Sequence, residues 1–258
     1  MRPENRNQVK ELSLFRRMSD EAFDRLLAGS FFQRFPAHVV LIREGDPADF
    51  LHIVIDGGVE LFCSWRDHET TISIARPIST FILAAVIKDA PYLMSARTLE
   101  PSSILMIPSK NIRQAMSDDS AFSLAMVEEL AACFREVVKA QKNLKLRSGV
   151  ERLANYLLWL DAEQQNSGRV TLPFEKKLLA SLLNMTPENL SRAFATLKPY
   201  GVAVSAAEVE LKNLDDLRRF AKPTPLIDDP GLPVAPYAAG FIAKFRADVE
   251  ERLRRLGG

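Results

Sequence analysis

The chain has 258 residues, a length that suits one large domain or two smaller ones. Hydrophobic residues make up 47% and charged residues 26%, which is typical of a globular protein and excludes a wholly disordered or collagen-like chain. Its two cysteines are too few for a disulfide framework or a four-cysteine zinc site. Because the N-terminus lacks an apolar signal core and no run of about 18 apolar residues is present, we expect a cytoplasmic protein without a membrane span.

Charge is distributed unevenly along the chain, although the formal net charge is only +1. Residues 1–117 carry 14 basic and 14 acidic side chains, and residues 199–258 carry 9 of each. Residues 118–138 have 1 basic and 5 acidic side chains, whereas residues 139–198 have 10 basic and 5 acidic ones. The excess positive charge therefore lies in one stretch, where it is available to neutralise the phosphates of a nucleic acid.

Residues 1 to about 117 alternate short strand-like runs with turn signals. Pro36, the Gly45-Asp46-Pro47 turn and the Asp56-Gly57-Gly58 turn are such signals. Strands are expected at residues 31–35, 39–43, 51–55, 59–64, 70–75 and 104–107. Several short strands at this spacing predict an all-β sandwich or barrel. A short helix at residues 20–28, with Ser19 as its N-cap, is expected to precede them.

Residues 118–146 are predicted to form one long helix, because no glycine lies between Gly58 and Gly149. A heptad-like line of apolar residues, spaced alternately four and three apart, runs along it: Met126, Leu130, Cys133, Val137, Ala140 and Leu144. This line predicts either a helix that lies on its own domain or a helix that pairs with its copy in a homodimer. A second apolar line, through Val127, Leu130, Phe134 and Val137, is available for the other surface.

Residues 147–220 are predicted to form a small helical domain after a hinge at residues 147–149. Helices are expected at residues 150–163, 175–183 and 187–200, a short strand or turn at 168–172, and a hairpin at 202–211. The last two helices, joined by Asn184-Met185-Thr186, are typical of a helix-turn-helix. Thr186 is a suitable N-cap for the second of them, and Pro187 is tolerated in its first turn.

The exposed face of that second helix is expected to carry polar side chains that read DNA. Glu188 and Arg192 are four residues apart and share a face, either as a solvated ion pair or as readers of base edges. In the major groove an arginine binds guanine and a glutamate accepts from cytosine, while Ser191 suits a base or a phosphate. The candidate DNA-binding residues are Thr186, Glu188, Asn189, Ser191, Arg192, Lys176 and Lys177.

Residues 221–258 begin with the proline-rich segment KPTPLIDDPGLPVAP, which is not expected to form a regular helix. Residues 237–256 are predicted to form a terminal helix with a basic C-terminal end. The function of this extension is left open by the sequence.

The order of β-domain, long helix and helix-turn-helix resembles the cyclic AMP receptor protein/FNR superfamily of bacterial transcription regulators. Residues 42–61, IREGDPADFLHIVIDGGVEL, are similar to the strand–turn–strand signature of the cyclic-nucleotide-binding fold, and residues 186–192, TPENLSR, are similar to the recognition helix. The resemblance implies an α+β chain with a cyclic-nucleotide-binding-like β-roll as sensor domain at 1–117, a dimerisation helix at 118–146, a winged helix-turn-helix at 147–220 and the extension at 221–258. It implies a homodimer that binds double-stranded DNA and RNA polymerase, and Ser191 implies a palindromic, FNR-type site with TTGAT-like half-sites.

The family's nucleotide pocket uses a Gly-Glu pair that opens a short helix and an Arg-Ser pair downstream. In this chain Leu83-Ala84 stand where the Gly-Glu pair is expected, and Met94 stands where the arginine is expected. The effector-pocket candidates are Phe81, Ile82, Leu83, Ala84, Met94 and Ser95. Because a phosphate here would lose its charged partner, at a cost of about 1.5–3 kcal/mol, we expect cyclic AMP not to bind in the family's manner. Two cysteines also exclude the four-cysteine iron–sulfur cluster of the oxygen-sensing members.

The sequence therefore leaves three possibilities for the control of this protein: an unknown signal, activity without any effector, or sensing through haem. Residues 88–92 resemble regulators of denitrification that respond to nitric oxide, some of which use haem, and the candidate ligands are His38, His52 and His68. The alternative to a DNA-binding regulator is an interaction module that has the cyclic-nucleotide-binding fold but does not bind DNA. No G-x-S-x-G, P-loop, H-E-x-x-H or G-x-G-x-x-G motif is present, so we do not expect an enzyme.

Overall fold

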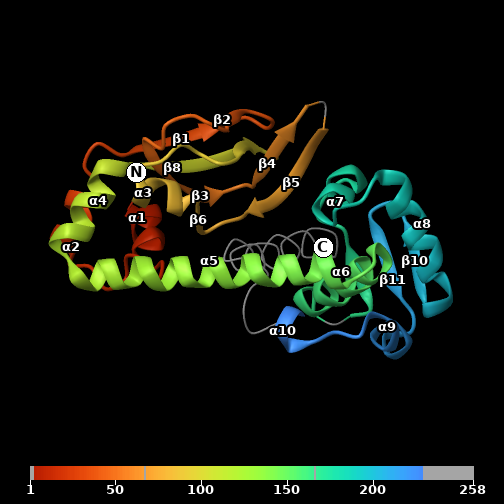
Figure 1. Ribbon diagram of the computed structural model, residues 1–258. Helices are drawn as coiled ribbons and strands as arrows, with labels where there is room; N and C mark the ends of the chain where they lie inside the picture. The colour runs from red at the N-terminus through yellow and green to blue at the C-terminus, as the bar shows by residue number, and fades with distance from the viewer. Residues whose placement is uncertain (1–2, 67, 166, 229–258) are drawn as a thin grey trace, which may run out of the picture. The chain divides into compact units, whose positions relative to one another are not determined.

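The structure is a computed structural model, and it describes residues 3–66, 68–165 and 167–228. The described residues form two compact units, one up to Arg135 and the other from Glu136 onward, so that the boundary lies within the long helix α5 (Ser120–Leu146; Figure 1). Within the described ranges, no helix combines the length and the apolar character needed to cross a membrane. The predicted terminal helix at 237–256 lies outside the described residues.

The first unit consists of two four-stranded sheets and short helices. Its elements before α5 are α1 (Pro3–Lys10), α2 (Asp20–Leu26), β1 (Phe31–Phe35), β2 (Val40–Ile42), β3 (Phe50–Asp56), β4 (Val59–Trp65), β5 (His68–Ala75), β6 (Ser79–Phe81), α3 (Leu83–Lys88), β7 (Ser95–Thr98), β8 (Ser102–Pro108) and α4 (Ser109–Asp118). The strand orders are β1-β8-β3-β6 and β2-β7-β4-β5, with antiparallel neighbours throughout. The predicted β-roll is confirmed, whereas β6, β7, α1, α3 and α4 were not indicated by the sequence pattern.

Two glycines make the turns of the nucleotide-binding-like signature, as predicted. Gly45 and Gly57 have φ of +88° and +87°, a conformation that side chains other than glycine rarely adopt. Space around Gly45 is open, but a Cβ atom on Gly57 would lie 2.7 Å from the backbone oxygen of Pro101 and would also clash with Ser102. The second turn therefore requires glycine for two independent reasons.

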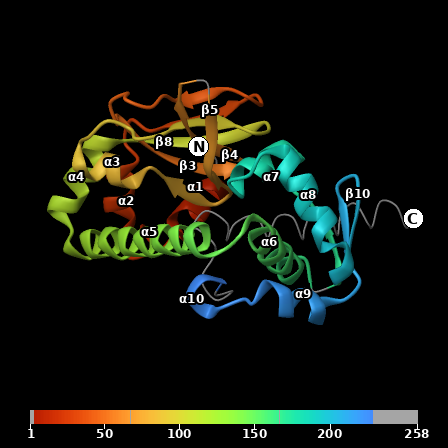
Figure 2. The same cartoon turned by 45° about the vertical axis from the view of Figure 1, so that its right-hand side comes forward.

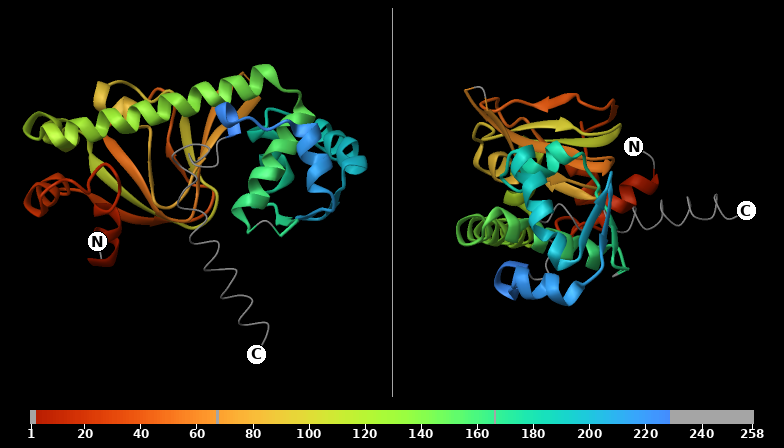
Figure 3. Two further views of the ribbon diagram at one scale, coloured as in Figure 1. Left: turned by 90° about the horizontal axis from the view of Figure 1, so that it is seen from below. Right: turned by 90° about the vertical axis from the view of Figure 1, so that its right-hand side faces the viewer.

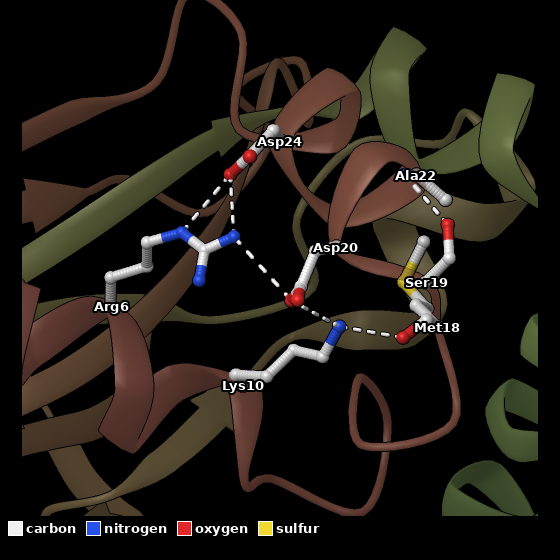
Figure 4. A network of polar contacts seen from close by, with 7 residues as sticks. All are labelled: Arg6, Lys10, Met18, Ser19, Asp20, Ala22 and Asp24. Atoms are coloured by element: carbon white, nitrogen blue, oxygen red, sulfur yellow. Dashed lines mark hydrogen bonds and ion pairs between the residues drawn. The ribbon is translucent and has the colours of Figure 1, made fainter.

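The N-terminal helices are joined by a polar network (Figure 4). Ser19 accepts a hydrogen bond of 3.1 Å from the backbone N–H of Ala22 and caps α2, which confirms the predicted N-cap. Arg6 of α1 donates to Asp24 at 2.7 Å, and Lys10 donates to the backbone oxygen of Met18 at 2.6 Å. Both cations also lie over the buried ring of Phe23, so α1 and α2 are held together by charge and by cation–π contact.

The first turns of α5 pack on the β-roll. Asp119 accepts hydrogen bonds from the backbone N–H groups of Ala121 and Phe122, so this carboxylate begins the helix and separates it from α4. Phe122 and Met126 are buried in the core of the first unit. The prediction that Met126 lies in a dimer seam is therefore wrong, because its side chain faces its own domain.

The second unit contains the helix-turn-helix and a small sheet. Its further elements are α6 (Gly149–Glu163), β9 (Arg169–Thr171), α7 (Lys176–Leu182), α8 (Pro187–Leu197), the 3-10 turn η1 (Lys198–Tyr200), β10 (Val202–Ser205), β11 (Glu208–Leu211), α9 (Leu214–Ala221) and α10 (Pro225–Asp228). The sheet order is β10-β11-β9, and the hairpin of β10 and β11 follows α8 after the turn η1 (Figure 2). The prediction that the proline-rich segment lacks a helix is wrong at α10, where Pro225 occupies the first turn and Asp228 accepts from the backbone N–H of Thr224.

Candidate nucleic-acid interface and effector region

The helix-turn-helix has the local geometry that its sequence predicts. Helix α7 ends at Leu182 with Leu183 as its C-cap, and Asn184 follows with φ of +51°, a left-handed conformation that asparagine tolerates. The side chain of Thr186 accepts a hydrogen bond of 3.2 Å from the backbone N–H of Asn189 and caps α8, with Pro187 in the first turn. Leu190 and Phe194 are buried beneath α8, so the opposite face of the helix is fixed toward solvent.

The exposed face of α8 carries the predicted readers Glu188, Ser191 and Arg192. The pKa of Glu188 is lowered by a hydrogen bond from its own backbone N–H, by the hydroxyl of Thr186 and by the charge of Arg192. This carboxylate is therefore ionised at the N-terminus of the helix. The hydroxyl of Ser191 donates to the backbone oxygen of Pro187 at 3.0 Å and keeps its lone pairs available as acceptors. The other predicted contacts, Thr186, Asn189, Lys176 and Lys177, are exposed as well.

Arg152 of α6 contacts the helix-turn-helix, which the sequence did not reveal. Its Nε and Nη2 atoms donate to the backbone oxygens of Leu183 and Asn184, at 3.0 and 3.2 Å, and thereby bind the turn between the two helices of the motif. Burial lowers the pKa of this guanidinium, which is held by carbonyl groups at the C-terminal end of α7. Only contacts between residues far apart in the chain identify it as a positioning residue.

The predicted effector-pocket residues come from β6, α3, β7 and the segment before β7. Phe81 and Leu83 are buried in the core of the first unit, and Ile82 and Met94 pack partly against it. The hydroxyl of Ser95 accepts a hydrogen bond of 3.0 Å from the backbone N–H of Glu44. Ala84 is exposed. The predicted pocket residues thus divide between the core and the surface.

Ile82 begins α3 with φ of +59°, which is a rare conformation for a β-branched residue. Glycine is favoured at such a position. Leu83 and Ala84, which stand where the family's Gly-Glu pair is expected, therefore follow directly after a residue whose backbone conformation favours glycine.

Two family models match the chain: the cyclic nucleotide-binding domain at residues 32–119 and the Crp-like helix-turn-helix domain at residues 151–220. Together they cover more than half of the chain, in the order that the fold shows. The chain belongs to the Crp/Fnr superfamily of transcription regulators. Its α+β fold of β-roll, long helix and helix-turn-helix is that of the superfamily.

Relatives of known description agree with this membership. A CRP-like cAMP-activated global transcriptional regulator of Mycobacterium tuberculosis is 23% identical over 194 residues, which are 73% of this chain and 87% of the relative. The structure of a proposed cAMP-binding regulatory protein from Silicibacter pomeroyi is 28% identical, with a TM-score of 0.55 over 86% of this chain and 100% of that chain. FixK2 from Bradyrhizobium japonicum is similar in fold, with 19% identity and a TM-score of 0.64 over 76% of this chain and 98% of FixK2.

The residues of this Crp/Fnr protein do not fit the phosphate of a cyclic nucleotide. Arg97, on β7, is the arginine next to the predicted pocket in sequence, and it is already engaged. Its Nε atom donates to Glu60 at 2.7 Å and its Nη2 atom donates to Glu69 at 2.5 Å. With these acidic partners in place, the Nε and Nη2 atoms of Arg97 are less available to a second anion than those of an unpaired arginine.

The three candidate haem ligands differ in their surroundings. His38 and His68 are exposed. His52 on β3 is only 4% exposed, with its ring stacked 5.2 Å from that of Phe81 and 6.4 Å from that of Tyr92. Its Nδ1 atom is buried without a hydrogen-bond partner, so an iron would reach it only if these rings moved. Among the described residues no group of three or more His, Cys, Asp or Glu side chains is arranged to hold a metal ion.

Proposed function

We propose that this Crp/Fnr protein is a homodimeric, sequence-specific regulator that inserts α8 into the major groove of DNA. The observation that carries the proposal is the exposed face of α8, where Glu188, Ser191 and Arg192 project from a helix whose other face is buried. A rigid helix with one arginine and one ionised carboxylate on its outer face matches the donor and acceptor pattern of guanine and cytosine edges. The excess of basic residues over 139–198 supports contact with the flanking phosphates.

The outer face of α5 supports the dimer. Val127, Phe134 and Val138 are 58%, 68% and 42% exposed, and they follow one another at intervals of seven and four residues. All three residues of this line are exposed, whereas Met126 of the other line is buried in the first unit. Two copies paired along it would present two recognition helices to two half-sites about one helical turn apart. Of the other predicted seam residues, Val137 and Leu144 are exposed, and Leu130 is partly buried against the first unit.

The regulator acts on a signal other than cyclic AMP, or without one, and meets RNA polymerase at its promoters in the cytoplasm. The engaged state of Arg97 and the absence of an arginine at position 94 support this part of the proposal. Isothermal titration of the purified protein with cyclic AMP is expected to show no binding at micromolar concentrations. A micromolar dissociation constant would contradict it.

The decisive experiment compares Glu188→Ala and Arg192→Ala with Arg218→Ala. Arg218 is an exposed arginine on α9 whose partner is Asp215 at 3.7 Å, so the control removes a cation from the same unit without touching α8. Electrophoretic mobility shifts on a duplex with two TTGAT half-sites should show at least about tenfold weaker binding for each α8 variant, and unchanged binding for the control. A wild-type protein that does not discriminate this duplex from a scrambled one would favour the interaction module without DNA binding.

A further inference from the structure

The segment that follows the helix-turn-helix domain returns to the connection between α5 and α6. Lys222 ends α9 in a left-handed conformation, and the chain then turns into α10. Lys142 near the end of α5 donates to the backbone oxygen of Leu226 at 3.3 Å. Figure 3 shows α10 beside the last turns of α5, within the second unit. The matched helix-turn-helix family model ends at residue 220, so this contact belongs to a part of the chain outside it.

The central contact joins Arg147, in the connection, to Asp228 at the end of α10. Its Nη1 atom donates to Oδ1 of Asp228 at 2.6 Å, and Nη2 donates to Oδ2 of the same carboxylate. The side chains are only 7% and 20% exposed. Nη1 also donates to Asn143 at 3.1 Å, and Oδ2 of Asp228 accepts from Thr224 at 2.8 Å. A bidentate pair so far withdrawn from water is strongly oriented, and loss of either partner leaves the other charge buried and unpaired.

The backbone of Arg147 extends this contact toward the recognition helix. Its carbonyl oxygen accepts a hydrogen bond of 2.7 Å from Nη1 of Arg152. The remaining donors of the Arg152 guanidinium bind Leu183 and Asn184, at the turn that precedes α8. Hydrogen bonds therefore run without a gap from Asp228 through Arg147 and Arg152 to the helix-turn-helix.

We propose that residues 222–228 form a latch that holds the connection between α5 and α6 and, through Arg152, the position of α8. With the latch closed, the last turns of α5 and the recognition helix are held together, because Arg147 binds Asp228 through its side chain and Arg152 through its carbonyl oxygen. Opening it frees residues 147–148 to change their backbone angles. The consequence for DNA rests on the proposed function, whereas the latch itself does not.

Hydrogen–deuterium exchange on the full chain tests the latch without DNA. Asp228→Asn removes the anion, and Asp215→Asn is the matched control, because Asp215 makes an exposed pair with Arg218 in the same unit. We expect Asp228→Asn to raise exchange about tenfold in peptides that cover 143–152 and 183–186, and to leave β9–β11 unchanged. The control should leave all of these peptides unchanged. The reversed pair R147D/D228R should return exchange to within about threefold of the wild type.

Unchanged exchange at 143–152 in Asp228→Asn would overturn the proposal, as would failure of the reversed pair to restore protection. Loss of protection in β9–β11 as well would also overturn it, since the pair would then hold the whole unit and not the connection. DNA binding is measured separately. If the wild-type protein binds no DNA but the variants show the expected exchange pattern, the latch is supported and the proposed function is contradicted. If the protein binds DNA specifically but the exchange pattern is missing, the proposed function is supported and the latch is contradicted.

Discussion

The Nε atom of Arg152 donates a hydrogen bond of 3.0 Å to the backbone oxygen of Leu183, the C-cap residue of α7. The last carbonyls of a helix lack partners within the helix and carry partial negative charge, so a guanidinium beside them both satisfies and neutralises them. In this protein that contact also determines where the turn before α8 lies. One side chain of α6 therefore supports the geometry of the whole helix-turn-helix.

Arg152→Gln should destabilise the second unit by about 2 kcal/mol, because three hydrogen bonds from a charged donor are lost. A Trp65→Phe background leaves Trp159, which packs against the core of that unit, as the reporter of urea unfolding. Arg169→Gln, at an arginine that is 77% exposed, is the control and should change nothing measurable. Equal midpoints for both variants would show that Arg152 does not support the turn.

The two apolar lines of α5 should respond in opposite ways to substitution. Met126→Ala empties a fully buried site and should cost about 2–5 kcal/mol of stability without altering the oligomeric state. Phe134→Asp adds a charge to an exposed apolar surface and should dissociate the proposed dimer with little loss of stability. Urea unfolding and sedimentation velocity separate the two effects. A monomeric wild type, or a Phe134→Asp protein that stays dimeric, would exclude this face as the dimer interface.

His52 should make the stability of the first unit fall in mildly acidic solution. Burial lowers the pKa of His52 to about 4, and the nearby backbone oxygen of Phe50 opposes part of that shift. In the unfolded chain the same imidazole titrates near pH 6.5, so between these values the unfolded state binds more protons. Its contribution is therefore complete above about pH 6.5 and is lost as the pH falls toward 4, by about 3 kcal/mol in total.

His52→Phe tests this dependence, because phenylalanine preserves the stack on Phe81 and leaves Tyr92 donating to the oxygen of Phe50 at 2.9 Å. Between pH 7 and pH 5 the wild type should lose about 2 kcal/mol more than the variant in urea unfolding. His68→Phe, at an exposed histidine, should keep the wild-type slope. Parallel pH profiles for the wild type and His52→Phe would assign the acid sensitivity to other groups.

The two signature glycines should differ in their tolerance of alanine. Gly45→Ala introduces only the strain of a left-handed alanine, about 1 kcal/mol, since nothing lies within 4 Å of the new Cβ atom. Gly57→Ala adds a steric clash with Pro101 and Ser102, so we expect about 3 kcal/mol. Urea unfolding by circular dichroism measures both. Equal losses would mean that the second turn relaxes around the methyl group.

Local features were well predicted because their causes are local. Ser19 and Thr186 were identified as caps since a hydroxyl side chain at a helix N-terminus binds a backbone N–H only two or three residues away. The turns at Gly45 and Gly57, and the exposed face of α8, follow likewise from residue type and helical spacing. The elements missed, such as β6 and β7, are three and four residues long, too short for a period to show.

Contacts across long stretches of chain were decided by the tertiary structure alone. Both apolar lines of α5 have helical spacing, and only the presence of the β-roll against Met126 selects the one that stays exposed. In the sequence Arg147 and Arg152 look like ordinary surface arginines. Their partners are far away in the chain: Asp228 is 81 residues from Arg147, and Leu183 is 31 residues from Arg152. The sequence by itself determined the family, the fold and the position of the recognition helix, because these rest on patterns within a few residues. Which charges are paired, and which faces stay free, depended on the packing of distant segments.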